Sequence, residues 1–197
     1  MPTGVAIRDP RAQLFDAAER LLLRDGPHAL TSRAVTAEAG YAKGVLHRHF
    51  ADFDAFLAEL VLDRIERLGD QAAALRDSAG TGTVPATVAA ALTGIFGPVA
   101  VAIIALVTFR DDVRARLRAA RRAPGIPLVS EATAMIADYL RAERDLGRLT
   151  PAADIDTLAP TLIGSGHLLF ADRTGEPPTA AALERTVTAV LAGVLTG

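Results

Sequence analysis

The chain has 197 residues, enough for one domain or two small ones, and its abundance of Ala, Leu and Val with only 5% aromatic residues favours an all-α protein. Cysteine is absent, which excludes thiol catalysis, cysteine-ligated zinc and a disulfide scaffold. The net charge of -2 argues against a nucleic-acid binder, but residues 1–50 carry seven basic and five acidic side chains, against fourteen and eighteen in residues 51–197.

The first predicted helix covers residues 10–24, where apolar side chains recur at helical spacing and charges occupy the opposite face. Gly26 and Pro27 end it. Two short helices follow, at residues 32–39 and 43–50.

The start and end of the first short helix are marked by polar and glycine signals. The hydroxyl of Thr31 can accept a hydrogen bond from an orphan amide, so this residue is a good N-cap. Gly40 supplies the left-handed backbone that ends such a helix at little steric cost.

Apolar residues four apart give both short helices a buried face, with Val35 and Ala39 on the first and Leu46 and Phe50 on the second. Two short helices joined by a glycine turn form the unit that lays a second helix in the major groove of DNA. The segment therefore predicts a three-helix helix-turn-helix module over residues 1–51.

A longer helix begins after Asp52, a plausible cap, and continues to a flexible loop at 78–83. Its stripe is formed by Phe53, Phe56, Leu57, Leu60, Val61, Arg64, Ile65 and Leu68. We assign residues 52–197 to a second, C-terminal helical domain.

Residues 78–109 contain no charged side chain, so a membrane-spanning helix is an alternative to two buried helices. Gly94, Gly97 and Pro98 interrupt the run, and Pro98 suits the first turn of a new helix, which favours two buried helices. The N-terminus lacks a basic segment followed by an apolar run, so we expect a cytoplasmic protein without a secretory signal.

The last part of the chain begins with a short, polar, arginine-rich segment at 111–122, followed by a helix from about Leu128 to Leu146. Two final helices, 154–170 and 180–195, form a pair. The first is apolar over most of its circumference and must be buried on two sides, so we predict that this pair forms the interface of a homodimer. About nine helices are expected in all.

The pattern resembles the tetracycline-repressor (TetR) family of bacterial transcription regulators. The match covers residues 11–60, and a weaker one covers Arg141–Leu149. It rests on Leu14, Ala17, Ala18, Gly26, Thr31-Ser32-Arg33-Ala34-Val35, Ala39-Gly40, Lys43-Gly44, Leu46 and His49-Phe50.

The resemblance implies a homodimer with a DNA-reading module on each subunit and a C-terminal ligand pocket. A small hydrophobic or aromatic effector would release a palindromic DNA operator. Three positions depart from the family pattern: His47 replaces a tyrosine, Phe53 replaces a lysine, and Ala42 replaces a capping serine or threonine. The alternative function is a small-molecule-binding protein of this fold with weak or lost DNA recognition.

The resemblance places the DNA contacts in and around the second short helix. Arg33, Lys43, Gly44, Val45 and His47 are the expected base-facing set, and Lys43 is the chain's single lysine. Candidate phosphate contacts are Thr31, Ser32, Tyr41, Arg48 and His49, with Ala42 beside them at the helix start. Arg8 and Arg11 are expected to form an arm near the minor groove.

The ligand pocket is expected among apolar residues with few polar groups, as is typical of small-molecule sites. Its candidates are Phe96, Ile103, Leu106, Val107, Met135, Tyr139, Leu162, Gly166, His167 and Phe170.

An enzyme is the competing class. Ser165 and His167 are two residues apart on one helix and point in different directions, so they cannot form a nucleophile–base pair. The sequence shows neither metal-ligand spacing nor a glycine-rich phosphate loop. We expect no catalytic residue, metal or cofactor.

Overall fold

The computed structural model describes residues 9–121, 125–171 and 176–196. These residues are all-α, as predicted, and their only β pairing is an isolated bridge between Leu149 and Leu195. In chain order the helices are α1 (Pro10–Asp25), the 3-10 helix η1 (Pro27–Ala29), α2 (Ser32–Glu38), α3 (Val45–His49), α4 (Phe53–Asp77), α5 (Val84–Ile95), α6 (Pro98–Phe109), α7 (Asp111–Arg121), α8 (Val129–Asp145), α9 (Ile155–Ala171) and α10 (Ala180–Leu191).

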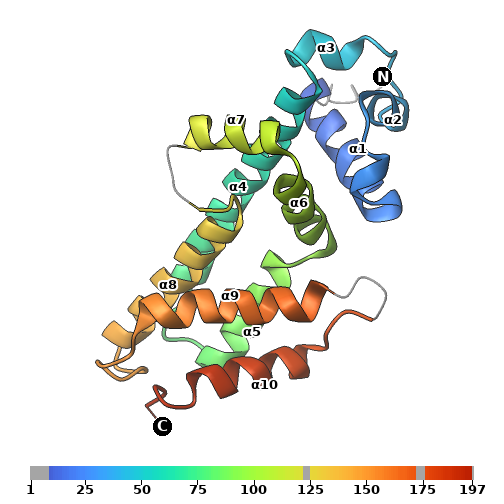
Figure 1. The fold of residues 1–197 in the computed structure, drawn as a ribbon. Coiled ribbons are helices and arrows are strands. Elements are labelled where there is room, and N and C mark those ends of the chain that lie inside the picture. The colour runs from blue at the N-terminus through green and yellow to red at the C-terminus, as the bar shows by residue number, and fades with distance from the viewer. Residues whose placement is uncertain (1–8, 122–124, 172–175, 197) are drawn as a thin grey trace, which may run out of the picture.

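Helices α1, α2 and α3 lie together at one end of the molecule, far from α9 and α10 (Figure 1). Three aromatic rings from different helices hold this end together. The ring centroid of Phe15 lies 5.7 Å from that of Phe50 and 5.6 Å from that of Phe56, and Phe50 and Phe56 are 5.0 Å apart. Since Phe50 directly follows α3, this cluster fixes α3 against α1 and α4.

Helix α4 has 25 residues and connects the two ends of the molecule (Figure 1). At 1.5 Å per residue it is on the order of 37 Å long. Helices α7 and α8 pack against it, while α10 packs against α5 and α9. One cluster of buried apolar residues extends from α1 through α4 to α10. The division into domains at residues 51 and 52 stays a prediction.

The loop between α4 and α5 is tied to the end of α8 through a buried carboxylate. Glu143 is fully buried, accepts a hydrogen bond from the amide of Gly80 at 3.2 Å and forms an ion pair with Arg148 at 3.2 Å. Arg148 also donates to the carbonyl of Gly82. Burying a carboxylate away from water costs free energy unless the carboxylate is paired and hydrogen-bonded. The contacts of Glu143 with Arg148 and with the Gly80 amide offset this cost.

The described ranges contain ten α-helices where about nine were expected, and the additional one is α7, because the arginine-rich segment was assigned no helix. Its acidic first turn and basic last turn complement the helix dipole. Val113 and Leu117, four residues apart, are both buried. The four-residue spacing of Val113 and Leu117 was the feature of the sequence that could have predicted this helix.

Two predicted helices are shorter than expected. Helix α3 starts at Val45 and not at residue 43, because Gly44 precedes it and no side chain caps it. Helix α10 ends at Leu191 and not at residue 195, where Leu195 pairs with Leu149 in the isolated bridge.

The apolar run between residues 84 and 109 is split into α5 and α6, with Pro98 at the first position of α6 as predicted. Across the described ranges, no single helix has the length and composition needed to cross a membrane. The pair Val84–Ile95 and Val99–Thr108 meets that requirement only when taken together, and it is bent by 62°.

Candidate nucleic-acid interface and ligand cavity

The turn between α2 and α3 has the geometry that the sequence predicted. The hydroxyl of Thr31 accepts a hydrogen bond from the amide of Ala34 at 3.1 Å and caps α2. Gly40 has a φ of 74°, the left-handed conformation, and a Cβ added there would meet nothing within 4 Å. The backbone alone therefore requires glycine, and the turn leads into α3.

Three basic side chains of this module remain unpaired on its surface. Arg33, Lys43 and Arg48 are exposed, and none of their side chains forms an ion pair or hydrogen bond with a residue that the structure describes. By contrast, Arg20 and Arg24 both bind Glu38, at 2.8 Å and 3.1 Å. These hydrogen bonds hold the pKa of Glu38 below its usual value. The unpaired charges are the ones expected to contact DNA.

The other predicted DNA contacts differ in exposure. Thr31, Ala42, Gly44 and His47 are exposed, while Ser32, Tyr41 and His49 are partly buried. The hydroxyl of Tyr41 donates a hydrogen bond to Gln13 of α1, so that proton is already engaged.

The expectation that Val45 faces bases is wrong for this conformation. Its side chain is only 6% exposed, because the first residue of α3 turns inward beside fully buried Leu46. Leu46 and Phe50 are buried as predicted.

Arg11 does not belong to an arm, because it lies in the first turn of α1. It forms an ion pair with Glu59, donates to the carbonyl of His49 at 3.0 Å, and places its guanidinium 4.5 Å from the ring centroid of Phe50. It therefore joins α1, α3 and α4. Arg8 lies outside the described residues.

Ion pairs connect the start of α4 to α7 and to Arg110, the residue that precedes α7. Asp52 caps α4 by accepting a hydrogen bond from an amide at 2.7 Å, and Arg116 of α7 binds its carboxylate at 2.7 Å. The amide first, and then Arg116, hold the pKa of Asp52 below its usual value. Arg110 binds Asp54 at 2.6 Å and lies over the ring of Phe53, 5.8 Å from its centroid. The ring of Phe53 therefore packs under the guanidinium of Arg110.

A small cavity lies between α4, the α5–α6 junction and α8, and its volume is about 20 Å³. That space is close to the room needed by one water molecule. It is lined by Arg64, Leu68, Gln71, Gly94, Ile95, Phe96, Ala100, Ile104, Leu128, Val129 and Ala132. The wall is apolar except for Arg64 and Gln71, both on α4.

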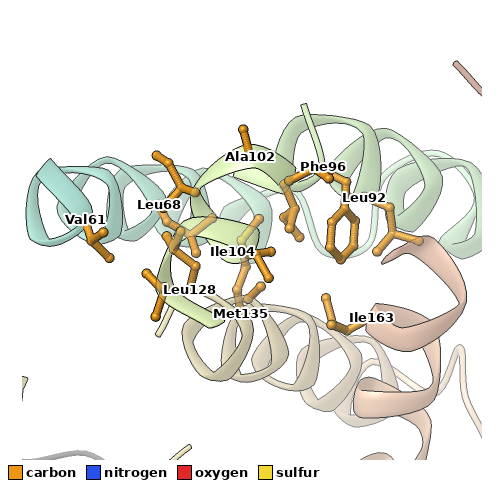
Figure 2. Packing of buried hydrophobic residues seen from close by; sticks show 14 of the residues in the cluster. Val61, Leu68, Leu92, Phe96, Ala102, Ile104, Leu128, Met135 and Ile163 are labelled. Atoms are coloured by element: carbon orange, nitrogen blue, oxygen red, sulfur yellow. The ribbon is translucent and has the colours of Figure 1, made fainter. Parts of the chain in front are cut away.

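Phe96 fills the space beside this cavity. Its ring points toward α9 (Figure 2), and a Cβ added to Gly166 would lie 2.9 Å from it. The ring stacks on Phe170, with centroids 6.0 Å apart, and lies 5.8 Å from the ring of His167. Phe96 is 1% exposed, so its ring is part of the packed core.

Comparison with known proteins agrees with this geometry. A sequence profile described as "Bacterial regulatory proteins, tetR family" matches residues 14–60. The N-terminal module, residues 14–60, therefore matches the TetR family. This module is a DNA-binding helix-turn-helix of a transcription regulator. No curated protein matches the sequence.

Solved transcriptional regulators share this fold over nearly the whole chain. A ketosteroid transcriptional regulator, KstR2 of Mycobacterium tuberculosis, is 21% identical with a TM-score of 0.64 and covers 97% of each chain. A TetR regulator from Haloarcula marismortui is 16% identical with a TM-score of 0.70, over 94% of this chain and 98% of that one. One from Agrobacterium tumefaciens is 15% identical with a TM-score of 0.70, over 94% and 97%.

Among the cavities formed by described residues, the predicted ligand residues are not gathered in one open pocket. Phe96 borders the small cavity, and Leu106 borders a separate open cleft beside η1. The remaining candidates pack in the apolar core or, for His167 and Phe170, at its edge: Ile103, Val107, Met135, Tyr139, Leu162 and Gly166.

Tyr139 is fully buried, and its hydroxyl has no hydrogen-bond partner among the described residues. Burial, and then the carboxylate of Glu143, raise the pKa of Tyr139.

Sequence reasoning missed Arg64 and Gln71 as lining residues. The available signal was Arg64 itself, a charged residue on the apolar stripe of α4. Leu68 and Gln71 follow at helical spacing and continue the same face.

Proposed function

We propose that this chain is a TetR-family transcriptional repressor that binds a palindromic operator as a homodimer and is released by a small hydrophobic molecule. The observation that carries the proposal is the set of unpaired cations Arg33, Lys43 and Arg48 around the exposed helix-turn-helix. Free cations can replace the counterions of DNA phosphates, and those near the start of α3 can reach base edges.

The dimer is supported by the outer face of α9 and α10. Leu168 is 76% exposed and Leu169 is 37% exposed, both near the end of α9. The outer side of α10 carries a shallow groove lined by Ala181, Glu184, Arg185, Thr188, Ala189 and Ala192. Exposed large apolar side chains beside a groove of small residues favour a second copy of the chain as occupant.

The dimer is tested by sedimentation of Leu168→Asp, which we expect to be monomeric at micromolar concentration. Leu23→Asp on α1 is the control, since Leu23 is also exposed, at 48%, but lies far from α9. A wild-type monomer, or a Leu168→Asp dimer as tight as wild type, would refute this interface.

Operator binding is tested by selecting bound sequences from a random DNA pool and titrating them in mobility-shift assays. Lys43→Ala and Arg33→Ala should each weaken specific binding by about 1–3 kcal/mol. Arg76→Ala, an exposed arginine at the distant end of α4, is the matched control and should change nothing.

The alternative function, a ligand-binding protein with weak or lost DNA recognition, is favoured by Phe53, which contacts Arg110 where the family has a phosphate-binding lysine. Failure to select any palindromic sequence, with binding equally weak for all sequences, would establish that alternative. A strong dependence of affinity on salt together with a selected palindrome would establish the repressor.

A further inference from the structure

The charged residue at the cavity wall is unusual for its surroundings. Arg64 is partly buried on α4, yet it has no hydrogen bond or ion pair with any residue in the described ranges. Arg67, one turn further along, binds both Asp63 and Glu19. Glu19 also attracts Arg64 electrostatically, but the carboxylate of Glu19 makes its ion pair with Arg67, at 3.5 Å.

Gln71 lies seven residues after Arg64, on the same face of α4, and both line the cavity. A guanidinium presents several N–H donors and an amide two more, and neither the partly buried Arg64 nor the exposed Gln71 has a side-chain acceptor among the described residues. The other nine lining residues offer only apolar side chains or glycine. Two donors at one edge of an apolar wall match a molecule with one anionic end.

Resting on the proposed function, we propose that the effector is an apolar molecule with a single carboxylate, held by Arg64 and Gln71. Its hydrocarbon part lies between α4, α6 and α8, where Leu68, Ile104 and Leu128 form the wall. Bidentate hydrogen bonding to a carboxylate is the interaction that arginine geometry favours.

Room for the hydrocarbon part comes from Phe96. The cavity holds about 20 Å³, far less than a site for a drug-sized ligand. The Phe96 ring lies at the end of α5, beside Gly97, where the chain breaks before α6. The ring lies against Gly166 of α9, so its rotation away from this glycine would extend the cavity toward α9. The ligand therefore replaces the ring.

The proposal is tested by isothermal titration of straight-chain and phenyl-substituted carboxylic acids of six to twelve carbons, each compared with its own primary amide. We expect at least one acid to bind ten-fold or more tightly than its amide. Arg64→Met should abolish that preference and leave the affinity for the amide within two-fold. Arg64→Lys, which keeps the charge, should retain part of it.

Arg76→Met is the matched control, because Arg76 is on the same helix but does not line the cavity, and it should keep the full preference. If no acid binds better than its amide, or if Arg64→Met keeps the preference, the proposal is wrong. Because titration needs no DNA, loss of operator binding alone would refute the repressor function and leave the carboxylate site standing.

Discussion

Replacing Phe96 by Ala should leave a void where the structure places the ring. The side chain is 1% exposed and contacts Gly166 and Phe170. Removal of a fully buried phenylalanine costs about 3–5 kcal/mol, through lost transfer energy and the cavity that remains. For a chain of this size each kcal/mol lowers Tm by about 2–4 °C, so Tm should fall by about 6–20 °C.

The assay is urea unfolding followed by helical circular dichroism, at one protein concentration for all variants. Leu23→Ala is the control, because Leu23 is 48% exposed and its truncation should change stability by about 0.5 kcal/mol or less. Benzene should stabilise Phe96→Ala more than wild type, since a dry apolar void binds such molecules. A loss below about 1 kcal/mol, or no effect of benzene, would refute the packing described for Phe96.

Three further predictions concern other parts of the chain. Gly40→Ala should lower the free energy of unfolding by about 1–2 kcal/mol, because the φ of 74° at this position disfavours a residue with a Cβ. Gly69→Ala inside α4 should raise the free energy of unfolding by about 0.5–1 kcal/mol. Equal effects of the two substitutions in urea unfolding would contradict the turn geometry. Glu143→Ala should lower the free energy of unfolding by about 3–5 kcal/mol in the same assay, because it removes the buried carboxylate that pairs with Arg148 and accepts from the Gly80 amide, and a loss below about 1 kcal/mol would contradict that pairing. The pKa of Asp52 is lowered, so its contribution is complete above the usual Asp value of 3.8 and is lost as the pH falls through the lower native value. The difference in stability between wild type and Asp52→Asn should therefore shrink on acidification, and an acid-independent difference would contradict the cap.

The helix-turn-helix was predictable because its signals are local. The Thr31 cap, the Gly40 turn and the four-residue apolar spacing each act within one or two turns of helix, and each has the predicted conformation. The orientation of Val45 was not predictable in this way. It depends on where α3 begins, and an uncapped five-residue helix takes its position from tertiary packing.

The cavity was less predictable, because apolar residues look alike in a sequence whether they fill a core or line a pocket. Phe96 and Tyr139 are both fully buried aromatics, yet Phe96 borders the cavity and Tyr139 does not. Only long-range packing separates the two cases. The role of Arg11 was missed for the same reason, since its partner Glu59 lies 48 residues away.

The stability of α3 comes from inward-facing residues such as Leu46 and from Phe50 after it, while His47 and Arg48 face solvent and contribute little to folding. Substitutions at these two outward positions are therefore nearly free of structural penalty. Evolution, or an engineer, can alter the DNA sequence that such a scaffold prefers without first compensating for a damaged fold.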